Sequence, residues 1–302
     1  MESLLSLAFD NLSSYDGIKI KKGLKQVEGL LAQICLSSPR PSSRQTPADP
    51  LGIQSSSESQ RPPRKVLADL SSDPAFREFF KLQDGFEWNI AQRLLPTLDW
   101  LVARGGDGQY DLLIVNALDL IQGVLLLHPP SKVLFSRTMH MNLLLDLIEP
   151  VNCPAVQSAT IITLVVALLD CPQNTRVFER LDGLLTITSL FKDPDTVREV
   201  KFRLTEFLYF YLTPETPSIP KASSSNQGGN GNNNGLLQRS PSKLVGAFGA
   251  GGGKRDRSVS ESSGAVLSVE TKKHYVDRYL PGVVDLLVKD LDTYKPFGGI
   301  LS

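Results

Sequence analysis

One cysteine in this 302-residue chain comes close to the spacing of a catalytic motif. A cysteine phosphatase needs Cys, five residues and then Arg, because the thiolate attacks phosphorus while loop amides and the guanidinium hold the phosphate oxygens. Cys171 is followed by Arg176 after only four residues, and no suitable Arg follows Cys35 or Cys153. The spacing therefore excludes a cysteine-phosphatase cradle.

A glycine-rich run comes close to a second motif, the nucleotide-binding P-loop. That loop needs Gly, four residues, Gly-Lys and then Ser or Thr. In the run GAGGGKR, Phe248 stands at the first Gly position and Arg255 at the hydroxyl position. No strand is expected before the run, so the sequence predicts a flexible loop here.

The histidines and acidic residues give no further sign of catalysis. His128, His140 and His274 are the only histidines, and they form no zinc-like spacing with the cysteines. His128 precedes two prolines at the end of an apolar segment, where a cation would favour the dipole of a helix. The acidic residues are scattered along expected helices. We therefore expect no enzyme, with no catalytic residue, cofactor, metal or small-molecule substrate.

Four hydroxyl residues in polar stretches are candidate phosphorylation sites. Ser240 is followed by Pro and has Lys at plus three, as proline-directed kinases favour, and Ser260 has Arg at minus five and minus three, as basophilic kinases favour. Ser38 and Thr46 are each followed by Pro and are weaker candidates. Each phosphate would add about −1.5 to −2 charges. Ser-Pro pairs are also common in disordered segments without such a role, and both interpretations stay open.

Composition divides the chain into folded segments and loops. The stretch 37–65 is rich in Ser, Pro and Arg, and 213–269 is rich in Gly, Ser and Asn. Neither can bury enough apolar surface to offset its ordering entropy, so we expect two long disordered loops with excess positive charge. The remaining segments are N-terminal helices in 1–36, a main helical body in 66–212, C-terminal helices docked on that body in 270–292, and a tail in 293–302.

The folded segments have the periodicity of helices. An apolar stripe predicts a helix over 23–36, and 111–127, 155–169 and 197–212 are also expected to be helical. A helix over 86–103, with a kink at Pro96, would carry Trp88 and Trp100, which we interpret as core anchors.

Two Asp-Pro pairs, at Asp73 and Asp193, are read as helix starts, because Asp caps free amides and Pro fits the first turn. No run alternates polar and apolar residues over strand length. The sequence therefore predicts an all-α fold.

Two parts of the sequence resemble each other when the chain is aligned with itself at an offset of about 43 residues. This alignment pairs Pro129 with Pro172 and Phe135 with Phe178, and Leu144 and Leu147 align with Ile187 and Leu190. Such a period is typical of armadillo or HEAT repeats, in which each helix pair covers the apolar face of its neighbour. A chance resemblance within a helical protein is the alternative.

The overall balance of residues restricts the class of partner. The 32 basic and 32 acidic residues give zero formal net charge, which argues against a surface built wholly for nucleic acid or membrane. The longest apolar run, 161–169, is too short to span a bilayer. The N-terminus lacks the basic region of a signal peptide, and three scattered cysteines suit a reducing compartment.

Four segments together resemble the fungal cell division control protein 14 family, a component of the septation initiation network and not the dual-specificity phosphatase of the same name. They are AFREFFKLQDGFEWNIAQRLLPTLDWL, NALDLIQGVLLLHPPSKVLF, the pair RVFERLDGLLTITSLFKDP and VREVKFRLTEFLYFYL, and KKHYVDRYLPGVVDLLVKDLDT. The resemblance covers 1–36, 66–213 and 270–292.

The resemblance implies a non-catalytic partner of a germinal-centre-class protein kinase, acting in the cytoplasm and at the spindle pole body during septum formation and cytokinesis. It identifies no individual partner-binding residue. A general armadillo-like adaptor or scaffold is the alternative. Attachment of the basic loops to membrane or nucleic acid is the less favoured interpretation.

Overall fold

The computed structural model describes residues 1–36, 70–106, 108–215 and 266–294, with only the backbone of Asp292 and Tyr294. These ranges contain helices and no strand element, which confirms the all-α class. In chain order the helices are α1 (Glu2–Leu12), α2 (Gly17–Cys35), α4 (Pro74–Asp84), α5 (Ile90–Arg104), α6 (Asp111–Leu127), the 3-10 helix η1 (Pro129–Ser136), α7 (Thr138–Ile148), α8 (Pro154–Leu168), α9 (Pro172–Arg180), α10 (Gly183–Lys192), α11 (Arg198–Leu212), α12 (Val269–Asp277) and α13 (Val284–Tyr294).

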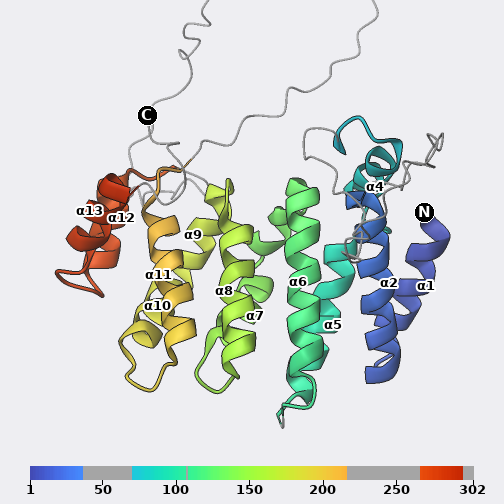
Figure 1. Cartoon of the computed structure of the whole chain (residues 1–302), viewed down its shortest axis with the longest axis horizontal. Helices are drawn as coiled ribbons and strands as arrows, with labels where there is room; N and C mark the ends of the chain where they lie inside the picture. The colour runs from blue at the N-terminus through green and yellow to red at the C-terminus, as the bar shows by residue number, and fades with distance from the viewer. Residues whose placement is uncertain (37–69, 107, 216–265, 295–302) are drawn as a thin grey trace, which may run out of the picture.

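Four of these helices form a row, here called the front row. Figure 1 shows α2, α6, α8 and α11 side by side, with α5, α7 and α10 behind them and α12 and α13 beyond α11. Packing agrees with the view, because α6 contacts both α2 and α8, and α8 contacts α11. The chain enters each front-row helix from the lower end in Figure 1, so the four helices run parallel.

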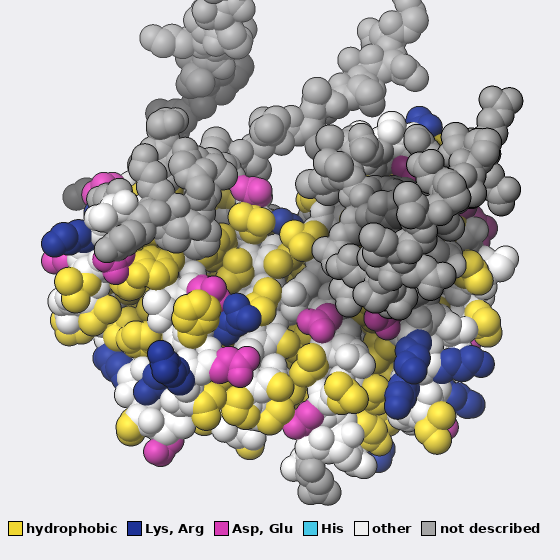
Figure 2. All heavy atoms as spheres, viewed as in Figure 1, with side chains coloured by type: hydrophobic (Ala, Val, Ile, Leu, Met, Phe, Trp, Pro, Cys, Tyr) yellow, Lys and Arg dark blue, Asp and Glu magenta, His cyan; other side chains and the backbone are white. Residues whose placement is uncertain are grey.

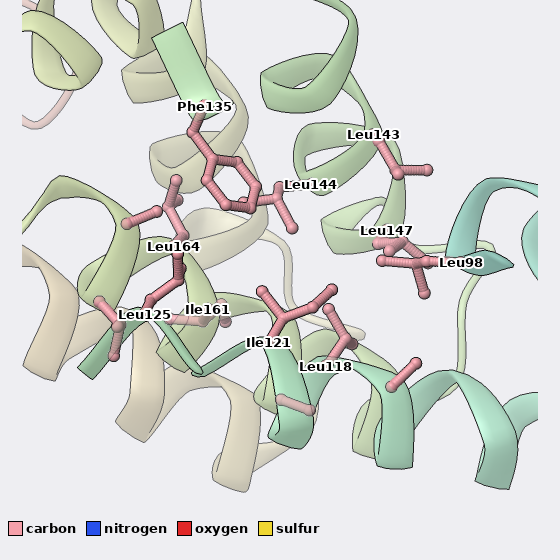
Figure 3. Close-up of a cluster of buried hydrophobic side chains, with 14 of the residues drawn as sticks. Leu98, Leu118, Ile121, Leu125, Phe135, Leu143, Leu144, Leu147, Ile161 and Leu164 are labelled. Carbon is pink, nitrogen blue, oxygen red and sulfur yellow. The ribbon is translucent and has the colours of Figure 1, made fainter. Parts of the chain in front are cut away.

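The core fills the space between the front row and the helices behind it. Figure 3 shows side chains of α5, α6, η1, α7 and α8 pointing toward one another, and its labelled residues include Ile121, Phe135, Leu144 and Leu164. All four are fully buried. Burying an aliphatic or aromatic side chain of this size contributes roughly 1.5–3 kcal/mol. The packing of helix on helix therefore supplies most of the stability.

Side chains of the N-cap residues fix the first residue of two helices, α4 and α5. Asp73 caps α4 by accepting from the amides of Ala75 at 2.7 Å and Phe76 at 3.3 Å, which confirms the predicted helix start. Asn89 caps α5, so this helix begins at Ile90 and not at Phe86 as expected. Trp88 therefore precedes the helix that carries Trp100 and Pro96, because the Asn89 cap sets the boundary.

The second Asp-Pro pair was wrongly interpreted as a helix start. Asp193 follows the last residue of α10, and α11 begins only at Arg198. The Asp193 carboxylate accepts from the amide of Asp195 at 3.1 Å and from the hydroxyl of Thr196 at 3.3 Å. Asp193 therefore stabilises the turn between the two helices, and no side chain caps α11.

Two successive groups of helices share one order. A short helix, a middle helix and a longer front-row helix occur as η1, α7 and α8, and again as α9, α10 and α11. Pro129 and Pro172 begin the short helices, and Phe135 and Phe178 are both fully buried. Assignment of these groups to an armadillo or HEAT-like repeat stays a prediction. Residues 37–65, the first predicted loop, lie outside the described residues, as do residues 216–265 of the second predicted loop, 213–269.

Candidate partner-binding surface

Cys171 and Arg176, whose spacing is close to that of a cysteine phosphatase, make contacts within the fold and not a phosphate cradle. Cys171 is the N-cap residue of α9, and burial raises the pKa of its thiol. Arg176 does not face this thiol as an anion-binding group would, because its Nη2 atom lies at two carboxylates, Glu179 and Glu215. Among the residues that the structure describes, no three His, Cys, Asp or Glu side chains gather as metal ligands.

His128 is a buried link at the end of α6. Its Nδ1 atom lies 2.8 Å from the Ser131 hydroxyl and its Nε2 atom 3.1 Å from Asp84 Oδ1. The imidazole and the Phe80 ring pack in a T-shaped arrangement, with their centroids 4.5 Å apart. His128 thus joins α6, η1 and α4, which fits the structural role expected at this helix end.

A buried cluster of two cations and two carboxylates joins the C-terminal helices to the main body. Through Nη2, Arg176 lies 3.0 Å from Glu179 Oε1 and 2.5 Å from Glu215 Oε1. Lys272 of α12 lies 3.2 Å from the same oxygen of Glu215. The Tyr211 hydroxyl donates to Glu179 Oε1 at 2.6 Å. The two positive and two negative charges balance one another; we call these five residues the ion cluster.

The ion cluster fixes both ends of the segment between α11 and α12. Lys272 Nζ donates to the carbonyls of Tyr211 at 2.9 Å and Thr213 at 3.0 Å, so it satisfies backbone acceptors at the C-terminus of α11. Glu215 also accepts from the amide of Leu267 at 3.0 Å. Residues on either side of the 216–265 segment therefore meet at one carboxylate.

Burial is the largest influence on the pKa values of Glu179 and Lys272 in the ion cluster. Desolvation raises the pKa of Glu179, although the Tyr211 hydrogen bond and Arg176 act in the opposite direction. Desolvation also lowers the pKa of Lys272, against the attraction of Glu215. Buried ion pairs of this kind fix position more than they add stability. We therefore interpret the ion cluster as the clamp that holds α12 in place.

The outward side of α8 is apolar and lies in the middle of the front row. The helix contains no charged residue, and its residues that are not buried are all apolar: Pro154, Ala155, Ile162 and Val165. Exposed apolar side chains continue onto the neighbouring helices, with Leu126 of α6 and Phe202 of α11 both more than half exposed. Figure 2 shows hydrophobic side chains on this face, with Lys, Arg, Asp and Glu side chains among them. We call the outward side of the front row the front face.

Hydrogen bonds align the two central helices of the front face. Gln122 of α6 donates to the Ala159 carbonyl at 3.3 Å and to the Thr163 hydroxyl at 3.0 Å. Because the helices run parallel, Leu126 lies one turn above this link, level with the upper part of α8. The apolar residues of both helices thus lie on a surface whose geometry is fixed before any partner binds.

The sequence did not reveal these residues. The four predicted phosphorylation sites, Ser38, Thr46, Ser240 and Ser260, lie outside the described residues. Glu215 falls in a stretch expected to be a loop, yet its side chain is buried in the ion cluster. The absence of charge in α8 was the one available signal for the front face. Within the described ranges, no helix is long and apolar enough to cross a membrane.

The described residues form an all-α protein with a buried ion cluster and with apolar side chains on the outward side of α8. The family model of cell division control protein 14, SIN component, matches residues 1–297, and the chain belongs to this family. It is similar to cell division control protein 14 of Schizosaccharomyces pombe, with 30% identity over 227 residues that cover 72% of this chain and 82% of the relative. No solved structure matches the chain. Family membership gives the protein a role in the septation initiation network, as the resemblance implied.

Proposed function

We propose that this protein is a non-catalytic regulatory subunit that binds a germinal-centre-class protein kinase of the septation initiation network. Its family membership supports the network, and the uncharged outward side of α8 supports a protein partner. The free energy falls when a partner covers apolar side chains that are otherwise exposed to water, so such side chains favour binding. The single observation that carries the proposal is this uncharged strip in the centre of the front face.

The rigidity of the front row supports binding of a folded partner. Its helices are fixed by the shared core and by links such as Gln122 to Thr163, so the surface loses little conformational entropy on association. A kinase domain that binds this surface better in one conformation would be shifted toward that conformation. In this proposal the protein acts as a regulator at the spindle pole body and in the cytoplasm during septum formation and cytokinesis.

Purification from dividing fungal cells tests the proposal. The tagged full-length chain should retain a germinal-centre-class kinase at one-to-one stoichiometry through size-exclusion chromatography, and kinase activity should be compared with and without the chain. A stable complex that contains other proteins but no kinase would favour the adaptor alternative. Turnover of a phosphopeptide by the wild-type chain, but not by Cys171→Ser, would contradict the non-catalytic role.

Phosphorylation is a second part of the proposal that the same material tests. Ser240 and Ser260 are proposed as regulated positions, with Ser38 and Thr46 as weaker ones. Phosphopeptide mapping of mitotic and interphase samples should show a higher occupancy at one stage. Equal or absent modification at both stages would remove this part of the proposal.

A further inference from the structure

The front face has an open cleft between the N-terminal ends of α2 and α6, with a volume of about 440 Å³. Its lining residues are Asp16, Gly17, Ile18, Lys21, Gln109, Tyr110, Leu112 and Leu113. Gly17 of α2 lies close to the Tyr110 ring, because a Cβ atom added there would be 3.0 Å from Tyr110 Cε1. The Tyr110 ring therefore forms a wall of the cleft. We call this feature the α2–α6 cleft.

Large apolar side chains lie exposed at the α2–α6 cleft. Ile18 is 83% exposed and Leu112 is 66% exposed, and both line the cleft. Tyr15 lies just before α2 and is 72% exposed. Its ring is 6.0 Å from that of Trp100, which in turn is 5.7 Å from Tyr110. Single exposed apolar residues are ordinary, but this group surrounds one concavity and continues into an aromatic cluster.

The backbone at Tyr15 supports a role for this group. Tyr15 has a φ of 53°, in the left-handed region that a bulky residue rarely adopts. Such a conformation is unfavourable for a bulky residue, and the surrounding structure must maintain it. The conformation keeps a large aromatic ring against Trp100 just before α2, where most of its surface is in contact with water.

Lys21 lines the α2–α6 cleft, Lys25 lies one turn further along α2, and neither forms an ion pair with a described residue. Lys19, Lys21, Lys22 and Lys25 all lie in the N-terminal half of α2 and are all exposed. Figure 2 shows a group of dark-blue side chains over this part of α2. Among the described residues, Asp16 is the carboxylate that lines the cleft, and it accepts from the amides of Ile18 and Lys19 as the helix cap. Positive charge near a helix N-terminus is unfavourable without an anion.

We propose that the α2–α6 cleft binds an acidic segment of a partner protein that inserts one bulky apolar side chain. The apolar side chain would contact Ile18, Tyr110 and Leu112, and the carboxylates of the segment would lie at Lys21 and Lys25 of α2. A concave site of this size fits a side chain of a peptide, whereas a flat anionic membrane would contact only its rim. The inference deepens the proposed function and rests on it for the identity of the partner, the kinase.

Affinity measurement with the purified kinase and the immobilised full-length chain tests this inference. Ile18→Asp should weaken binding about tenfold or more, the effect of losing one buried aliphatic contact. The double variant Lys21→Glu/Lys25→Glu should weaken it at least as much, and its affinity should depend less on salt concentration. An Asp in the first turn favours the N-terminus of α2, so unfolding of this helix would not explain the loss.

Matched variants elsewhere on the surface serve as controls. Val151→Asp replaces a side chain that is 85% exposed in another loop, and Lys192→Glu/Lys289→Glu reverses two exposed lysines outside the cleft. Both should bind the kinase like the wild type. If the wild-type chain binds the kinase and both cleft variants bind equally well, the inference is wrong while the proposed function stands. If the wild type does not bind the kinase, both fail.

The class of occupant is decided by two further measurements. Overlapping peptides of the kinase should bind the wild-type chain only where they are acidic and contain a bulky apolar residue, and Ile18→Asp should remove that binding. Capture of basic or neutral peptides would contradict the inference. Sedimentation with phosphatidylserine vesicles that is lost in Ile18→Asp, with kinase binding unchanged, would assign the cleft to membranes and overturn it.

Discussion

Replacement of Lys272 by Met should release α12 from the main body. The substitution keeps the length of the side chain but removes all three of its hydrogen bonds, to the carbonyls of Tyr211 and Thr213 and to Glu215. Leaving a buried acceptor unsatisfied costs about 1–3 kcal/mol, and breaking a buried ion pair costs about 3–5 kcal/mol. Two effects reduce the sum: Glu215 keeps its contact with Arg176, and the desolvation of the Lys272 ammonium is avoided. We expect a net loss of about 2–4 kcal/mol.

Hydrogen exchange measures this loss where it occurs. The amides of α12 should exchange faster in Lys272→Met by the factor that corresponds to the lost free energy, while the amides of α8 should keep their protection. Lys273→Met is the matched control, because the neighbouring side chain is only partly buried and lies outside the ion cluster. Equal exchange in α12 for the two variants, within about 0.5 kcal/mol, would refute the interpretation of the ion cluster as a clamp.

Four further predictions follow from the described contacts. Asn174→Ala removes donors to the carbonyls of Lys132 and Ala167, at 2.8 and 2.7 Å, and should lower the free energy of unfolding in urea by about 2–4 kcal/mol. Gly183→Ala places a Cβ atom against the buried Phe178 ring, where there is no room for it, and should cost about 1–3 kcal/mol in the same assay. The pKa of Glu179 is raised above 4.5 by burial, so folding favours its protonated form; urea titrations should show the wild type gaining stability over Glu179→Gln as pH falls toward 4.5 and losing it as pH rises through the raised pKa. Added salt should weaken kinase binding but leave the exchange rates of α12 unchanged, because solvent ions screen exposed charges far more than buried ones.

Much of the fold could be predicted because apolar periodicity is a local signal. The stripe Leu24, Val27, Leu30, Leu31 and Ile34 is buried as expected, and α6 has the predicted bounds Asp111–Leu127. In both segments the residues that face the core follow one another at helical spacing, so short windows of sequence contain the information. The apolar character of α8 was predicted for the same reason, although its exposed strip was not.

Boundaries and sites depended on information that no short window holds. The side chain of Asn89 reaches the Gln83 carbonyl at 2.7 Å and the Ser131 hydroxyl at 2.8 Å, and these contacts hold it as the cap that excludes Trp88 from α5. Asp193 followed by Pro fits both a helix start and a turn, and only the position of α11 distinguishes them. The ion cluster joins Arg176 to a residue 39 positions away, beyond any motif.

Charged side chains are buried and paired at the α11 end of the front row but exposed at the α2 end. This difference favours the α2 end as the place where an acidic partner would bind. At the α11 end, buried cations and carboxylates form ion pairs with one another, so these charges are not open to a partner. At the α2 end, lysines stay exposed beside an open apolar cleft, and no described carboxylate pairs with them. Desolvating a charge is favourable only when an opposite charge comes with it. The lysines at the α2 end can therefore still form favourable ion pairs with acidic groups of a partner. The charged residues at the α11 end already pair with one another within the chain.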